Sequence, residues 1–232
     1  MWRVGVEALT LVLVATLVLV ITFSPATLPQ AQHQSHRFSL TKLLPQKLIT
    51  TQRGRGMLVA IDANVEHGDA LAAGAIKGAK LVMLNAKEAS IEQITRAIRQ
   101  TETSSVHIVT HGSPGCLHFS SGDLTIENLH HYAEQLESWF HYRPFHRRSK
   151  MRVQGHENFL SLYSCNVAKG EVGQSFLERL HYLVGVSIHA SQRKVGSIAL
   201  NGSWNLDIAY PFPHQSEFPF TEDLLETYDA VL

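Results

Sequence analysis

Two short stretches carry the residues best suited to chemistry. The stretch HIVTHGSPG (107–115) ends an apolar, β-branched run with His111 and Gly112, and LYSCN (162–166) ends another apolar run at Cys165. A thiolate is a strong nucleophile, and a neighbouring imidazole can deprotonate the thiol or stabilise its anion. The pattern predicts Cys165 as nucleophile and His111 as general base. The backbone amides of Gly112 and Cys165 are the candidate donors to an oxyanion.

The elements that must position these residues follow from hydrophobic periodicity. Apolar runs predict buried strands at 57–62, 79–85, 106–110, 160–164 and 186–191. Amphipathic or Gly-terminated segments predict helices at 66–78, 90–100 (capped by Ser90), 126–140 and 171–185. This alternation is typical of an α/β fold with a mostly parallel sheet and helices on both faces. Neighbouring parallel strands lie about 4.8 Å apart, so His111 and Cys165 are expected at one sheet edge.

The remaining segments predict turns and a tail. Residues 116–126 alternate around a turn and resemble a small hairpin, and 197–210 predicts a closing β-hairpin around Asn201-Gly202. From residue 211 to 232 the chain carries five acidic residues and no Lys or Arg. We expect this acidic C-terminal tail to be a peripheral, solvated segment.

Two further residues have alternative interpretations. Asp62 ends the first strand. It is either a functional residue, as an acidic wall of the cleft or a carboxylate that orients a neighbouring group, or part of a turn or cap with Asn64. Cys116 follows His111 by five residues and either forms a redox-sensitive disulfide with Cys165 or is a separate thiol. His107 and His111 are four residues apart on a strand, about 13 Å, which is too far to bind one ion. A His/Cys site requires neither metal nor organic cofactor, and none is predicted.

Composition and the N-terminus bear on the partners and the compartment. The 20 basic and 20 acidic residues cancel, which gives no indication of nucleic-acid binding. The apolar run at 8–23 predicts a signal peptide or membrane anchor over 1–26, followed by a polar linker over 27–55. We therefore expect an exported protein that is periplasmic, at the cell surface or membrane-anchored. It contacts the membrane through the N-terminal segment if that segment is not cleaved.

Residues 57–210 resemble domain of unknown function 4347. Four of the matching blocks are VAIDANV (59–65), VHIVTHGSPGCLHF (106–119), LYSCNVAKGEVGQSFLERL (162–180) and IALNGSWNLDI (198–208). That family is common near the N-termini of large cyanobacterial surface and adhesion-type proteins. It is similar to the caspase, gingipain and separase group of cysteine peptidases. The resemblance implies a caspase-like three-layer sandwich at 56–210.

The same resemblance implies the site. In that peptidase group a His-Gly follows the third strand and a cysteine follows the fourth, and His111, Gly112 and Cys165 fall on those positions. The sequence departs from the family pattern at Ser164, where glycine is common, and at Cys116, where a small polar residue is usual. It also departs at 192–194, which is basic rather than acidic.

These observations predict one of two functions. The first is a cysteine peptidase, a hydrolase with a His/Cys dyad for limited or self-processing of cell-surface proteins, acting on a polypeptide substrate. The alternative is a non-catalytic module for export, anchoring or assembly, which binds a surface-protein partner.

Overall fold

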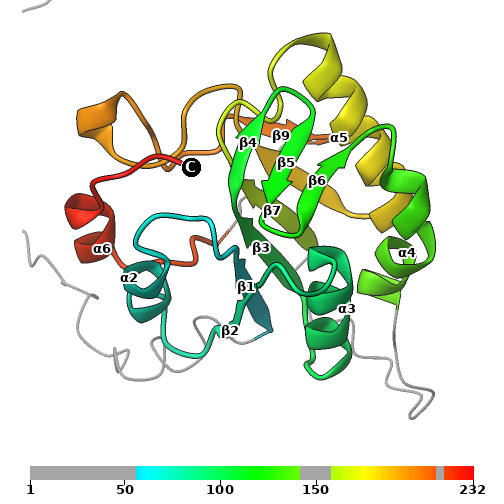
Figure 1. Cartoon of the computed structure of the whole chain (residues 1–232), viewed down its shortest axis with the longest axis horizontal. Coiled ribbons are helices and arrows are strands. Elements are labelled where there is room, and N and C mark those ends of the chain that lie inside the picture. Colours follow the sequence, from blue (N-terminus) through cyan, green and yellow to red (C-terminus); the bar gives the residue numbers. More distant parts are fainter. Residues whose placement is uncertain (1–55, 142–157, 213–216) are drawn as a thin grey trace, which may run out of the picture. The chain divides into compact units, whose positions relative to one another are not determined.

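The computed structural model describes residues 56–141, 158–212 and 217–232 (Figure 1). The segments expected to be a signal peptide or anchor (1–26) and a linker (27–55) lie outside these residues. Six strands form the main sheet in the order β2-β1-β3-β7-β8-β9. Their bounds are β1 (Met57–Ile61), β2 (Lys80–Met83), β3 (Ser105–Val109), β7 (Phe159–Tyr163), β8 (Ser187–Ala190) and β9 (Ile208–Tyr210). All neighbours are parallel except β8 and β9.

Side chains of the central strands alternate between two apolar clusters, as the pleat of a strand requires. On β1, Leu58 and Ala60 belong to one cluster, whereas Met57, Val59 and Ile61 belong to the other. Both faces of the sheet are therefore covered at the central strands, which explains why the sequences of these strands are continuous apolar runs.

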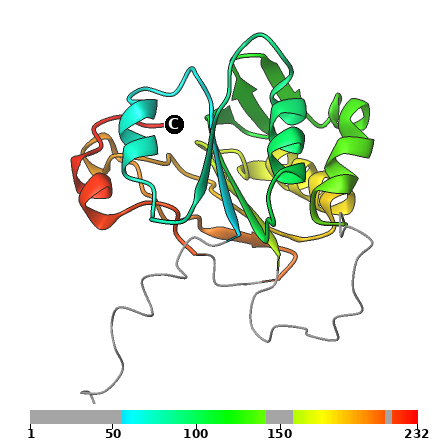
Figure 2. The same cartoon turned by 90° about the horizontal axis from the view of Figure 1, so that it is seen from below.

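Helices cover the two faces of the sheet (Figures 1 and 2). One side holds α3 (Ser90–Arg99), α4 (Ala133–His141) and α5 (Gly170–Val184), and the other holds α2 (Gly68–Ala73) and α6 (Glu222–Thr227). Short 3₁₀ helices, η1 and η2, occupy Leu129–Tyr132 and Ile198–Leu200. This arrangement confirms the expected α/β fold with a mostly parallel sheet between helices and is consistent with a three-layer sandwich.

A second, antiparallel sheet follows β3 directly. It has the order β4-β5-β6, with bounds β4 (His111–Ser113), β5 (Cys116–Phe119) and β6 (Gly122–Thr125). The hairpin expected at 116–126 is confirmed as β5 and β6. Residues 111–113, which fall between the predicted strand at 106–110 and the predicted hairpin, form the third strand of this small sheet. Pairing with β5 outweighs the turn preference of Gly112 and Ser113.

The closing strand is present, but its partner differs from the prediction. β9 pairs antiparallel with β8, whereas residues 198–200 form η2 instead of the first strand of a hairpin. Asn201 has a left-handed backbone, but it ends η2 rather than forming a hairpin turn. The Asn201-Gly202 pair therefore predicted the turn correctly, but the strand after it pairs with β8 and not with residues 198–200.

The C-terminal segment is not a solvated tail. Four of its side chains are buried in the cluster on the α2 side of the sheet: Phe220, Leu224, Tyr228 and Leu232. These positions are four residues apart, the spacing of one helical face, although the helix itself covers only part of the segment. The expectation rested on the acidic residues, which lie on the exposed side, and overlooked this apolar spacing.

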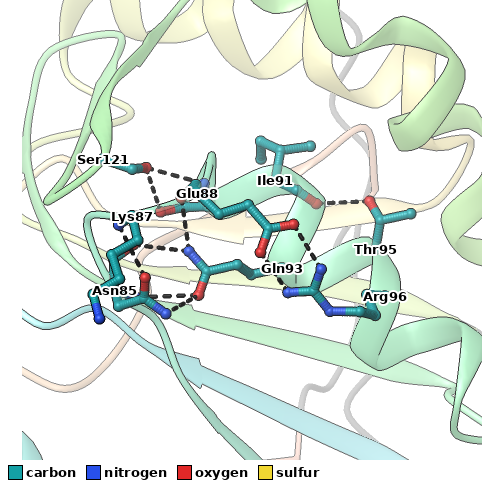
Figure 3. Close-up of polar contacts among 9 residues, drawn as sticks. Asn85, Lys87, Glu88, Ile91, Gln93, Thr95, Arg96 and Ser121 are labelled. Atoms are coloured by element: carbon teal, nitrogen blue, oxygen red, sulfur yellow. Dashed lines mark hydrogen bonds and ion pairs between the residues drawn. The ribbon is translucent and has the colours of Figure 1, made fainter.

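A buried amide organises the connection between β2 and α3 (Figure 3). The Gln93 side chain accepts from the backbone and side-chain amides of Asn85 and donates to the carbonyl oxygens of Asn85 and Glu88. Ser90 also differs from its prediction: Ala89 is the N-cap residue, and the Ser90 hydroxyl hydrogen-bonds Ser121 instead.

We expect Gln93→Ala to lower the free energy of unfolding by about 2 kcal/mol, because it leaves partly buried donors and acceptors of the loop without partners. Urea unfolding measures this change. Gln100→Ala is the matched control, because Gln100 is exposed beyond the end of the same helix. Equal unfolding energies for the two variants would contradict the role given to Gln93.

Candidate functional site

The structure places His111 and Cys165 at the same edge of the main sheet. β3 and β7 are parallel neighbours, with Val109 opposite Tyr163 in the last register pair. His111 and Cys165 each follow those residues by two positions, and the Thr110 amide continues the pairing by donating to the Tyr163 carbonyl at 3.2 Å. The expected juxtaposition of the two segments therefore exists.

Gly112 lies in direct contact with the segment that carries the cysteine. A Cβ atom at this position would collide with Ser164 Oγ and lie 3.1 Å from the carbonyl oxygens of Cys116 and Cys165. The Ser164 hydroxyl is buried and has no hydrogen-bond partner among the described residues. Only glycine allows the two strand ends to approach so closely.

The His111 ring has partners other than the thiol. Its Nε2 lies 3.1 Å from Glu66 Oε2 and 3.1 Å from the Asn64 carbonyl oxygen, and its side chain is 30% exposed. A nitrogen flanked by a carboxylate and a carbonyl oxygen is a donor, so Nε2 carries a proton in this arrangement. The unprotonated nitrogen of a neutral ring would then be Nδ1.

The Cys165 thiol is buried in the apolar cluster on the α2 side of the sheet. Its Sγ accepts from the Val195 amide at 3.2 Å and lies 3.7 Å from the Val195 carbonyl oxygen. Trp204, Tyr228 and Leu232 belong to the same cluster. Burial raises the pKa of the Cys165 thiol, and the backbone amides of Val195 and Leu232 and the charge of Lys194 offset only part of this shift.

His111 and Cys165 thus share an edge but not a hydrogen bond in the described structure. Burial holds the pKa of the Cys165 thiol above its ordinary value, which disfavours the thiolate. Attack on a carbonyl requires that the thiol reach solvent and pass its proton to a base. The structure therefore places the thiol and the imidazole at one sheet edge, with the thiol buried.

Asp62 is buried, and its carboxylate accepts four hydrogen bonds. The Asn64 amide donates at 3.2 Å, and Ser120 donates through its backbone amide at 2.8 Å and through its hydroxyl at 3.2 Å. The Ser90 hydroxyl donates at 3.5 Å. The hydrogen bond from Asn64 is the turn that was predicted as one alternative for Asp62. Asp62 also fixes the β5–β6 turn to the end of β1.

Cys116 lies in a group that the sequence pattern did not indicate. Its Sγ is 3.5 Å from Nδ1 of His118, and the same nitrogen is 2.8 Å from Asp123 Oδ1. Both cysteines are free thiols with different partners, as the alternative of separate thiols describes. The disulfide with Cys165 is the other alternative, which the thiol count below tests.

We expect two free thiols that react slowly in the folded protein. Burial and the Asp123 carboxylate raise the pKa of Cys116 to about 11, and burial also raises that of Cys165. Because only the thiolate reacts, alkylation at pH 8 should be slow in buffer and fast in denaturant. Thiol counting by mass spectrometry after purification without reductant checks this. A single disulfide-linked species would support the redox gate instead.

The fold and these contacts define a class of protein: an α/β domain with a mostly parallel sheet and polar residues gathered at one edge. The model of a family described as a domain of unknown function, DUF4347, matches residues 58–232, and the chain belongs to that family. The match includes the C-terminal segment from 211 onward. A search of curated proteins found no match. The likeness to caspases and the cyanobacterial setting stay predictions.

The membrane expectation concerns residues that the structure does not describe. Within the described ranges, no helix is long and apolar enough to cross a membrane. The apolar run at 8–23, which predicted a signal peptide or anchor, lies outside them.

Proposed function

We propose that this domain is a cysteine hydrolase of peptidase type, with Cys165 as nucleophile and His111 as general base. The observation that carries the proposal is the contact of Gly112 with the Ser164-Cys165 segment. It brings a His-Gly pair and a cysteine to one sheet edge from two different strands. Attack by the thiolate on a peptide carbonyl forms a tetrahedral oxyanion, for which the amides of Gly112 and Cys165 are the candidate donors.

Burial of the Cys165 thiol limits the conditions under which this site can react. The sulfur must become accessible and lose its proton before it reacts, which suits limited or self-processing better than continuous turnover. We place this activity in an exported protein, periplasmic, at the cell surface or anchored by its N-terminal segment, with a polypeptide as substrate.

The burial of Cys165 favours a second candidate function. Cys165 is only 6% exposed and contributes to the packing of the cluster shared with Val195 and Trp204. In a non-catalytic module for export, anchoring or assembly of surface proteins, the same residues would serve packing alone and the partner would be a surface protein.

Labelling of the full chain with a library of peptide acyloxymethyl ketones separates the two functions. Under reducing conditions with a metal chelator, the catalytic proposal expects a label on Cys165, located by mass spectrometry. His111→Ala should slow this labelling about 100-fold, the usual contribution of a general base. His131→Ala is the matched control, because His131 is exposed in η1, away from the contacts of His111 and Cys165, and should leave the rate unchanged. Slow labelling that is indifferent to His111 would overturn the catalytic proposal and favour the module.

A further inference from the structure

The small sheet gathers metal-binding side chains on one face. In an antiparallel sheet, directly opposed residues share a face, as do residues two apart on a strand. The register pairs Ser113 with Cys116 and His118 with Asp123, so all four side chains lie on one face. The other face carries apolar side chains of the core, Leu117, Phe119 and Leu124.

Three potential ligand atoms on this face converge. Cys116 Sγ, a ring nitrogen of His118 and a carboxylate oxygen of Asp123 all lie within 4.8 Å of one another. A tetrahedral zinc ion with ligand bonds of about 2.0–2.3 Å separates sulfur and nitrogen ligands by about 3.6 Å. The observed separation of Cys116 Sγ and His118 Nδ1 is 3.5 Å. Nδ1 and Asp123 Oδ1 are 2.8 Å apart, a hydrogen bond that needs to open by about half an ångström to admit the ion.

The surroundings of His118 complete the pattern of a metal ligand. Its Nε2 lies 2.9 Å from Ser113 Oγ. A ligating histidine donates its second N–H to a neighbouring acceptor, which fixes the ring and leaves the other nitrogen for the metal. Ser113 Oγ can accept from Nε2–H, so Nδ1, the nitrogen between Cys116 and Asp123, is the one that binds.

We propose that Cys116, His118 and Asp123 form a zinc site in the small sheet, with Ser113 as the residue that positions the imidazole. Thiolate and imidazole ligands select Zn²⁺ over Mg²⁺ and Ca²⁺. The His118 and Asp123 side chains are 36% and 55% exposed, so the fourth position is accessible from solvent. Three protein ligands and one open position are typical of zinc sites that bind a water or a substrate atom. The ligands come only from β5 and β6, whereas the Cys165 side chain packs in the cluster on the α2 side of the main sheet.

Titration of the chelator-treated, reduced full chain with Zn²⁺ by calorimetry tests the site. One equivalent should bind. Loading with Co²⁺ should produce a thiolate-to-cobalt absorption band in the near ultraviolet. Cys116→Ser should abolish this band, and Asp123→Asn should weaken Zn²⁺ binding by about tenfold or more. Asp123 is exposed, so its variant is expected to fold, and circular dichroism checks this.

Cys165→Ser is the matched control, since it removes the other thiol and should leave both the stoichiometry and the cobalt band unchanged. Bound Zn²⁺ should also protect Cys116, and not Cys165, from alkylation. Absence of binding, or a cobalt band that survives Cys116→Ser and disappears in Cys165→Ser, would overturn the zinc site. Neither outcome depends on the labelling experiment, which is performed in chelator.

Discussion

Replacing Gly112 with alanine is expected to lower the free energy of unfolding by about 3 kcal/mol, the upper end of the usual cost of inserting a methyl group into a packed region. The new Cβ would meet the Ser164 hydroxyl and two carbonyl oxygens, those of Cys116 and Cys165. Two of these three groups are backbone atoms, one in β5 and one in the turn after β7, so they cannot move aside as cheaply as a side-chain end. Chemical denaturation of the reduced protein measures the loss.

Two further variants show whether the loss of stability comes from the contacts at Gly112. Gly68→Ala is the control, because a Cβ there meets only side-chain atoms at 3.5 Å, an ordinary contact, and little or no loss is expected. The double variant Gly112→Ala/Ser164→Gly should recover part of the lost stability, since the hydroxyl is the closest obstacle and the carbonyl oxygens remain. If the double variant is no more stable than Gly112→Ala alone, the clash with Ser164 is not the cause.

Asp62→Ala should destabilise the domain by a similar amount, about 3 kcal/mol, because hydrogen bonds to a buried carboxylate are worth more than neutral ones and their loss leaves donors without acceptors. The Ser120 and Asn64 amides are the donors that lose their partner. The β5–β6 turn should loosen first, which hydrogen exchange at Ser120 would report.

Asp69→Ala is the control for this variant. Asp69 is exposed in the first turn of α2, where a carboxylate contributes only a weak interaction with the helix dipole. A small, equal effect of both substitutions would show that the hydrogen bonds of Asp62 do not hold the turn. Asp62→Asn should be intermediate, since the amide keeps one acceptor oxygen.

The main sheet was predictable because its central strands, β1, β3 and β7, are covered on both faces. Continuous apolar runs such as Met57–Ile61 and Phe159–Tyr163 are typical of strands buried on both faces and fit few other positions in a fold. Once these strands are parallel neighbours, residues that follow them fall at one edge. The placement of His111 and Cys165 at one sheet edge could therefore be predicted from the sequence.

The orientation of the side chains was not predictable in the same way. Whether Cys165 faces His111 or the core depends on Val195 and Leu232, which are distant in sequence and have no pattern that links them to the cysteine. The strand at His111–Ser113 was missed because three residues are too few to show periodicity.

The group of Cys116, His118 and Asp123 is a different case. Cys116 and His118 alternate on a strand and Asp123 lies just beyond the turn, so the hairpin prediction already places all three on one face if the register is known. A shift of one residue would send Asp123 to the other face. The two-residue turn at 120–121 sets this register, and the sequence pattern alone did not specify it.

The packing of the C-terminal segment has a practical consequence for dividing the polypeptide. A fragment that stops at Tyr210 loses the bridges from Phe220 to Ala75 and from Val231 to Gly196, together with Leu224 and Tyr228. The faces that these residues cover, on β1, α2 and beside Cys165, would then be exposed to water as an apolar patch. Such a fragment is expected to aggregate on expression, whereas one that begins near Gly56 and includes Leu232 keeps the cluster closed.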